Sequence, residues 1–317
     1  MATTWTNVHN VPRALADAVT RDTKSSAGDY SVTQLLAPPR IRWLTQRHDV
    51  TEDVSERIWA LIGKGVHAVL ARQASDPEMQ LVASLGSTRI SGTLDSVEFE
   101  PDVPGGVIRD WKMTSTFVDA KGRKEWEQQL NLYRWLFAHA ACGINYRTGA
   151  MEKHRPKLAD RLLVTMIFRD WSAARAERAA EAIAKGEKDD YPSSISRTID
   201  VPVWTLPEAR RFLVDRLDIH RAAEASEAIP NLCSDEERWH RPGSYAVRKT
   251  GRKTAMRVLP SEADAVAWAE HNGSPGLSIE HRPGRDVRCE SWCPARSVCP
   301  HALSLPKPKP DNGEEPK

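Results

Sequence analysis

Apolar residues recur at helical spacing along residues 49–73, DVTEDVSERIWALIGKGVHAVLARQ. The stripe formed by this spacing consists of Val54, Ile58, Leu61, Ile62, Val66, Val69 and Leu70. Positions three and four apart lie on one face of a helix, so the pattern predicts a long amphipathic helix. A second helix is predicted over residues 124–142, KEWEQQLNLYRWLFAHAAC, in which Gln129 and Tyr133 share a face.

Between these helices the pattern changes to that of strands. Residues 81–86 and 88–99 predict two strands joined at Gly86, and the turn-rich PDVPGG leads into a third strand, VIRDWKMT. We therefore expect a three-stranded meander. Since side chains alternate along a strand, Asp110 and Lys112 project from one face and Trp111 from the other.

This placement of charges suggests metal-assisted chemistry. Asp95 lies on the neighbouring predicted strand, and two carboxylates that converge can bind a hard divalent cation. The ammonium of Lys112 lies beside them, where it can act on water. A D-x-K sequence by itself is common on exposed strands, where it only solvates one face. The ordered set of residues, with a hairpin between the two acids, carries more weight.

The succession of G-x-x-D, D-x-K and Q-x-x-x-Y resembles the nuclease core of the PD-(D/E)XK superfamily, in its RecB-type branch. That branch also carries a G-x-x-x-H helix before the first acid, which Gly63 and His67 match, although a lone histidine on a helix is usually a satisfied polar group. The resemblance implies an α/β, restriction-endonuclease-like core with a mixed, mainly antiparallel sheet flanked by helices. It implies that Mg²⁺ or Mn²⁺ is held by His67, Asp95, Asp110 and the backbone carbonyl of Trp111.

The same resemblance assigns roles to the remaining motif residues. Lys112 would orient or deprotonate the attacking water and stabilise the charge that develops on the phosphate. Gln129 and Tyr133 would meet the nucleic acid or lie in the shell around the active site. The alternative for this pair is a polar edge on a core helix.

Composition and charge narrow the picture only slightly. The 317 residues can form one large or two modest domains, and 45 Lys plus Arg against 43 Asp plus Glu give a net charge of +2. Contact with DNA must therefore come from local clusters, such as Arg252 and Lys253 in a predicted hairpin that turns near Gly251. A merely solvated basic face is the alternative. Because no apolar segment follows a basic start, we expect no signal peptide, no membrane span and a cytoplasmic location.

Four of the five cysteines suggest a metal centre. Cys289, Cys293 and Cys299 are spaced C-x3-C-x5-C, and Cys233 lies upstream, so four thiolates are available for zinc or for an iron–sulfur cluster. Structural zinc prefers C-x2-C knuckles, which are missing, and His301 is poorly spaced to replace a thiolate. Disulfides are disfavoured inside the cell.

This cysteine group resembles that of iron–sulfur nucleases of the same superfamily: CRISPR-associated RecB-like exonucleases, AddB-type subunits and related phage-encoded proteins. The resemblance implies a 4Fe–4S cluster, with Zn²⁺ as the alternative. Those families usually take the fourth cysteine from before the nuclease core, whereas Cys233 follows it. We favour Cys233 over Cys142, which is predicted to end an apolar helix where a small buried thiol is ordinary.

The sequence thus predicts four parts. These are a flexible extension over residues 1–29, a nuclease core over 30–228, a four-cysteine subdomain over 229–303 and a disordered tail over 304–317. The expected function is that of a metal-dependent DNA exonuclease in recombination, repair or phage DNA processing, with a helicase or recombinase as a candidate partner. The alternatives are a catalytically silent nucleic-acid-binding protein and a zinc-stapled partner of a recombination complex.

Overall fold

The computed structural model describes residues 2–21, 27–73, 79–118, 123–145, 149–154, 157–252, 254–273 and 276–306. It divides into two compact units. The core unit consists of Asn7–Pro39 and Asp53–Ala225, and the terminal unit of the residues up to Thr6, Arg40–Glu52 and the chain from Ser226 onward. None of the helices in the described ranges is long and apolar enough to cross a membrane.

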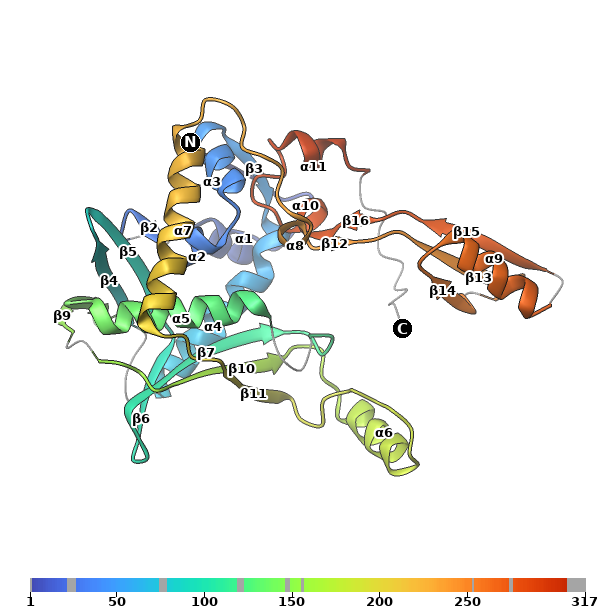
Figure 1. The fold of residues 1–317 in the computed structure, drawn as a ribbon, viewed down its shortest axis with the longest axis horizontal. Coiled ribbons are helices and arrows are strands. Elements are labelled where there is room, and N and C mark those ends of the chain that lie inside the picture. Colours follow the sequence, from blue (N-terminus) through green and yellow to red (C-terminus); the bar gives the residue numbers. More distant parts are fainter. Residues whose placement is uncertain are drawn as a thin grey trace. The chain divides into compact units, whose positions relative to one another are not determined.

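A four-stranded sheet in the core unit carries the D-x-K motif. Its order is β11-β10-β7-β6, and β10 lies between β7 and β11 (Figure 1). The pairing of β10 with β7 is parallel, whereas β10 with β11 and β6 with β7 are antiparallel. The strands span Ser96–Glu100 (β6), Val103–Thr114 (β7), Arg161–Phe168 (β10) and Ser196–Val201 (β11).

A second sheet of the core unit has five strands in the order β2-β5-β4-β8-β9. They span Tyr30–Ser31 (β2), Met79–Leu85 (β4), Thr88–Leu94 (β5), Cys142–Asn145 (β8) and Met151–Lys153 (β9). Cys142 therefore begins a strand and does not end a helix. The expected fold class, mixed α/β with mainly antiparallel sheets flanked by helices, is confirmed.

The expected meander is wrong in one respect. Residues 88–99 do not form one strand, because the chain leaves the five-stranded sheet after Leu94 and enters the four-stranded sheet at Ser96. Asp95 lies in the bend between the two. The alternating pattern continues through this position, so it reveals strands but not the partner with which each half pairs.

Helix α5 (Lys124–His139) is central to the core unit. All residues from 130 to 137 are buried, and the helix contacts α2, α7, β4 and β5. Its partners in the main hydrophobic cluster include Leu35, Leu81 and Leu213. The other helices of this unit are α1 (Arg13–Arg21), α2 (Val32–Leu36), the 3-10 turn η1 (Val54–Arg57), α4 (Ile58–Gln73), α6 (Ala173–Ala184) and α7 (Leu206–Ala225).

The helix predicted over residues 49–73 begins only at Ile58, after a strand at residues 50–53 and the turn η1, and its apolar stripe does not form a core. Val54 is buried, yet none of the described side chains of α4 is, and Ile62 and Val69 are exposed. Helical spacing shows which residues share a face, but it does not show whether anything covers that face.

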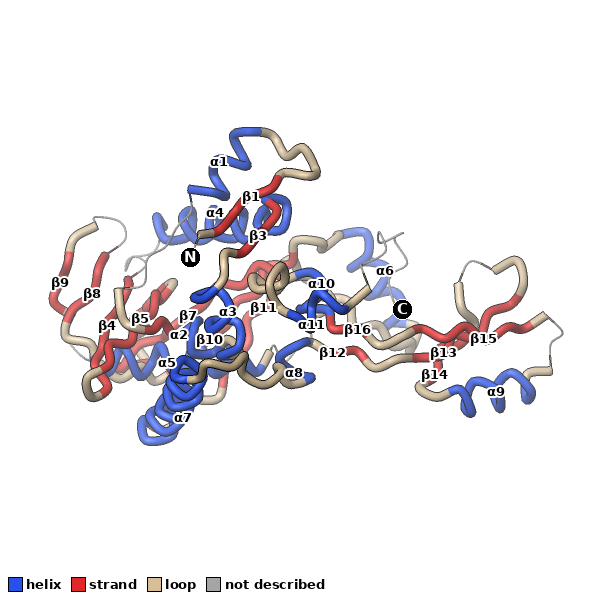
Figure 2. Tube along the Cα trace, turned by 90° about the horizontal axis from the view of Figure 1, so that it is seen from above, coloured by secondary structure: helices blue, strands red, loops and turns tan. Residues whose placement is uncertain are grey.

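The terminal unit begins with β1 (Thr3–Thr6), which pairs with β3 (Val50–Asp53). Within it, β13, β14 and β15 form an antiparallel sheet beside α9 (Figure 2). Its elements are α3 (Pro39–Arg47), α8 (Asp235–Arg238), β12 (His240–Arg241), β13 (Ser244–Lys249), β14 (Arg257–Leu259), α9 (Glu262–His271), β15 (Leu277–Arg282), β16 (Arg285–Asp286), α10 (Val287–Ser291) and α11 (Pro300–Ser304).

Two of the expected parts differ from this picture. Elements β1 and α1 lie within residues 1–29, where a flexible extension was expected. The terminal unit resumes at Ser226, close to the expected boundary at 229, but it also takes in the distant segment Arg40–Glu52. Of the expected tail, residues 307–317 lie outside the described part of the chain.

Candidate active site

Strand β7 places Asp110 and Lys112 side by side. Asp110 is only 3% exposed, and Lys112 Nζ lies 3.0 Å from its Oδ1 and 2.8 Å from its Oδ2. Lys112 Nζ also donates a hydrogen bond of 3.0 Å to Gln129 Oε1, and Gln129 Nε2 donates one of 2.8 Å to the Tyr133 hydroxyl. The lysine is therefore held between a carboxylate and a side chain of α5.

The glycine of the G-x-x-D motif explains how α5 comes so close. A Cβ atom at Gly92 would lie 2.6 Å from Leu136 Cδ1 and 2.8 Å from Tyr133 Cε1. Only glycine permits this approach without displacing the helix. Tyr133 itself is buried, 5% exposed, so the structure places it against Gln129 inside the unit and not on the surface.

The second acid lies on the other side of Trp111. Asp95 Oδ2 accepts a hydrogen bond of 2.9 Å from the Trp111 backbone N–H. His67, on α4, lies with Nδ1 3.2 Å from Asp95 Oδ1 and with Nε2 2.9 Å from the Trp111 carbonyl oxygen. His67, Asp95, Asp110, Trp111 and Lys112, all predicted from the sequence, thus meet in one place.

The titration of these groups reflects their burial and their charges. Burial raises the pKa of Asp110, and the neighbouring Asp95 raises it further, against the opposing effect of Lys112. Burial lowers the pKa of His67, but the hydrogen bond and charge of Asp95, the Trp111 carbonyl and the charge of Asp110 together raise it above its ordinary value.

The donors fit a divalent cation. Asp110 Oδ2 is buried, and Lys112 Nζ lies 2.8 Å from it as an ion-pair partner. Each carboxylate oxygen can accept from more than one partner, so Asp95 and Asp110 can also bind a cation. Two carboxylates, an imidazole and a backbone carbonyl are suitable ligands for Mg²⁺ or Mn²⁺.

The family comparison agrees with this geometry. Residues 6–300 match the family model of the PD-(D/E)XK nuclease superfamily. The chain belongs to this superfamily. No curated protein and no solved structure gives a significant match. Members of the PD-(D/E)XK superfamily are generally metal-dependent nucleases that act on nucleic acids.

One contributor to the site was not predicted from the sequence. Arg109 forms a bidentate ion pair with Glu98, with Nε 2.7 Å from Oε1 and Nη2 2.9 Å from Oε2, and donates through Nη1 to Thr165 Oγ1. Its guanidinium also lies 5.5 Å from the centroid of the Trp111 ring. Arg109 therefore ties β6, β7 and β10 together next to the metal donors. The R-D-W-K sequence alone does not identify this partner.

The terminal unit brings four of the cysteines together. Burial raises the pKa of Cys289 to about 12, and the charges of Cys293, Asp286, Cys233 and Cys299 add to the effect. Burial likewise raises the pKa of Cys233 to about 11, with a contribution from Cys293. Such mutual effects require proximity. Cys299 also packs with Ile41, Trp43 and Leu44 of α3, whereas Cys142 belongs to the core unit.

A buried aspartate next to these cysteines was missed by the sequence analysis. Asp286 accepts hydrogen bonds from His240 Nδ1 (2.7 Å), His301 Nε2 (2.6 Å) and the guanidinium of Arg238. We call Arg238, His240, Asp286 and His301 the Asp286 cluster. Donor atoms of Asp286, Cys289 and His301 lie within 4.8 Å of one another, a set that could also hold a metal ion. His301, which the spacing ranked low, is therefore close to the cysteines.

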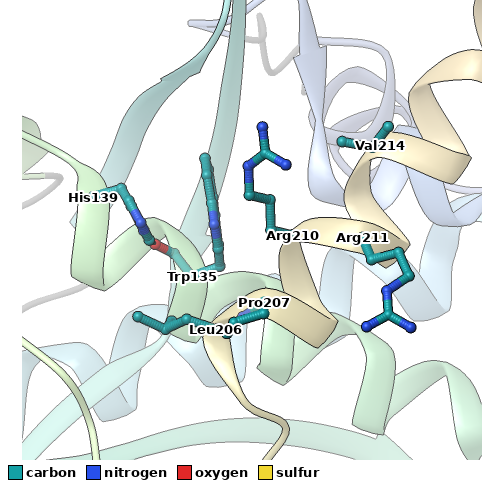
Figure 3. A pocket seen from close by; sticks show the side chains of 7 residues that line it. All are labelled: Trp135, His139, Leu206, Pro207, Arg210, Arg211 and Val214. Carbon is teal, nitrogen blue, oxygen red and sulfur yellow. The ribbon is translucent and has the colours of Figure 1, made fainter.

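Figure 3 shows a pocket of about 460 Å³ elsewhere in the core unit. It lies between α5 and the start of α7, and none of the motif residues lines it. Trp135 stacks on His139 at one side, with ring centroids 4.4 Å apart, and Arg210 and Arg211 stand on α7. The predicted DNA-contact residue Arg252 is exposed after β13 in the terminal unit, and Lys253 lies outside the described residues.

Proposed function

We propose that this chain is a RecB-type DNA nuclease that hydrolyses phosphodiester bonds with Mg²⁺ or Mn²⁺, as an exonuclease in recombination, repair or phage DNA processing. The observation that carries the proposal is the contact of Lys112 with the buried Asp110, beside a second acid, Asp95, that contacts His67. A catalytically silent binding protein would not need that arrangement to be complete.

His67, Asp95, Asp110 and the Trp111 carbonyl would hold the cation. When bound, it would polarise the phosphate and lower the pKa of a bound water. The imidazole among the donors favours Mn²⁺, because Mg²⁺ prefers all-oxygen ligation.

Lys112 would orient the water and stabilise the negative charge that develops on the phosphate. Asp110 and Gln129 fix its ammonium from two sides, so little reorganisation is required during the reaction. Tyr133 holds Gln129, and we assign this pair to the support of Lys112, with only the half-buried Gln129 available to the substrate path.

The test is cleavage of end-labelled single-stranded and duplex DNA with Mg²⁺, with Mn²⁺ or with chelator. Lys112→Ala should lower the cleavage rate by on the order of 100-fold or more, while DNA binding persists, because the lysine acts on the reacting groups. Lys185→Ala, which removes an exposed lysine beyond α6, is the matched control and should cleave normally. A near-normal rate for Lys112→Ala would rule out this role.

We further propose that Cys233, Cys289, Cys293 and Cys299 hold a 4Fe–4S cluster. Their proximity in the terminal unit supports a shared centre. Protein purified without oxygen should then be brown and contain iron and sulfide in near-equal amounts. A zinc centre, the second candidate, would leave it colourless, and the neighbouring Asp286 and His301 give zinc a plausible mixed ligand set.

DNA is the proposed substrate, and a helicase or recombinase the proposed partner. Arg252 and Lys253 would contact the phosphates, with help from other basic residues of the β13–β14 hairpin.

A further inference from the structure

Helix α4 carries a large exposed aromatic side chain that the proposed mechanism does not use. Trp59 is 47% exposed, on a helix whose first turns are apolar. The guanidinium of Arg169 lies over its ring, 4.8 Å from the centroid. A cation over a tryptophan face is a favourable pair, and here it leaves much of the indole open to solvent.

The position of Trp59 relates it to the metal donors. Trp59, Gly63 and His67 are spaced four residues apart and so form one row along the helix surface. Eight residues of helix span about 12 Å. The row between the tryptophan and the histidine is open at Gly63, because a Cβ atom there would meet no neighbouring atom within 4 Å.

The backbone contacts of Arg169 also locate the Trp59–Arg169 pair near the metal donors. The backbone N–H of Arg169 donates to the carbonyl of Thr114, the last residue of β7. Thr114 lies three residues beyond Trp111, whose carbonyl faces His67, and three strand residues span about 10 Å. The Trp59–Arg169 pair therefore lies beside the end of the strand that carries Asp110 and Lys112.

We propose that Trp59 stacks on an unpaired base of the substrate strand, with Arg169 close to the adjoining phosphate. The inference rests on the proposed function. A spacing of about 10 to 12 Å corresponds to roughly three stacked nucleotides at 3.4 Å each. Bases inside a duplex already stack on their neighbours, so an exposed indole selects a single-stranded or frayed end. The aromatic ring and the cation together match a nucleotide better than an apolar protein surface.

The test is the affinity for a short labelled single-stranded oligonucleotide, measured by anisotropy in chelator and in the Lys112→Ala background. Trp59→Ala should weaken binding by about 5- to 100-fold, the range expected for the loss of one base stack. Trp59→Phe should retain most of the affinity for the single strand. Trp59→Ala should weaken the binding of a blunt duplex much less than the binding of the single strand. Ile183→Ala, which removes an exposed apolar side chain on α6, is the matched control and should bind normally.

A second variant tests the path itself. Gly63→Leu should fold normally because a Cβ atom at this position meets no neighbouring atom within 4 Å, yet it should weaken single-strand binding by blocking the row of residues between Trp59 and His67. Unchanged single-strand affinity in Trp59→Ala, or an equal loss of affinity for blunt duplex, would overturn the inference about Trp59. The proposed function would still stand if the unmodified protein cleaves DNA in a metal-dependent manner. If the unmodified protein shows no metal-dependent cleavage, the proposed function fails, whatever Trp59 does.

Discussion

Asp110 in the core unit and Asp286 in the terminal unit are buried to nearly the same extent, at 3% and 4% exposed. Their pKa values nevertheless move in opposite directions. Burial raises the pKa of Asp110, whereas for Asp286 burial is outweighed by hydrogen bonds from His240, His301 and Arg238, so its pKa is lowered. The hydrogen-bonding and charged partners of each aspartate, and not its burial, decide the direction of its pKa shift.

The difference lies in the source of the charge that compensates each carboxylate. Asp286 obtains its compensating donors from its own chain. Asp110 has Lys112, but it also has the negative charge of Asp95 close by. The following predictions test this contrast, beginning with the largest expected effect.

Cys293→Ser should abolish the bound centre and loosen the terminal unit. A metal site that joins remote segments contributes its binding free energy to folding, so its loss lowers the melting temperature. Metal content and thermal unfolding measure the two effects. Cys142→Ser is the matched control and should keep the metal, because Cys142 lies in the core unit. If Cys142→Ser loses metal and Cys233→Ser keeps it, the assignment of the fourth ligand is wrong.

Asp286→Ala should destabilise the protein by about 3–5 kcal/mol, because it leaves the guanidinium of Arg238, which is 13% exposed, and two histidines without their buried acceptor. Denaturant unfolding measures this loss. Asp235→Ala is a matched control, since Asp235 pairs with the same Arg238 but is 74% exposed; it should cost less than about 1 kcal/mol.

The same measurement on Asp110→Ala sharpens the contrast. In chelator this change should cost about 1 kcal/mol or less, because Lys112 keeps Gln129 as an acceptor. A loss as large as that of Asp286→Ala would show that the two aspartates play similar structural roles.

The pH dependence of stability should differ between the two sites. The pKa of Asp286 is lower in the folded protein than in the unfolded chain, where it is about 3.9. Asp286 therefore stabilises the folded protein above about pH 3.9, and this stabilisation is lost as the pH falls through the folded-state pKa. The pKa of Asp110 is higher in the folded protein than in the unfolded chain. Its contribution to stability is therefore fully present below the unfolded-state pKa and is lost as the pH rises through the folded-state pKa.

In chelator, Asp286→Asn should therefore flatten the acid side of the stability curve, below about pH 4. Asp110→Asn should instead raise stability on the neutral side. Urea unfolding midpoints between about pH 3 and pH 8 measure both. Identical curves for the two variants would contradict the opposite pKa shifts.

The contrast also shows what could be predicted from the sequence. The acid–lysine site depends on short motifs whose members lie on regular elements, so strand spacing predicted Asp110 beside Lys112, whereas the role of His67 came from the resemblance to RecB-type nucleases. The Asp286 cluster draws on residues 15 to 48 positions apart with no shared pattern, so only the folded chain reveals it. The bend at Asp95 and the exposed side of α4 were likewise set by packing.

The smallest expected effect concerns the basic hairpin of the terminal unit. Arg252 and Arg257 are exposed on either side of the β13–β14 turn, and each duplex phosphate contact changes the slope of log affinity against log salt by about 0.9. If both residues touch phosphates, replacing them by alanine should flatten the slope by up to about 1.8. The matched control is Arg178→Ala with Lys185→Ala, which removes the same charge at exposed positions on and just after α6. Equal slopes for the two double variants would assign the hairpin charges to solubility, and the DNA path would then depend on the core unit.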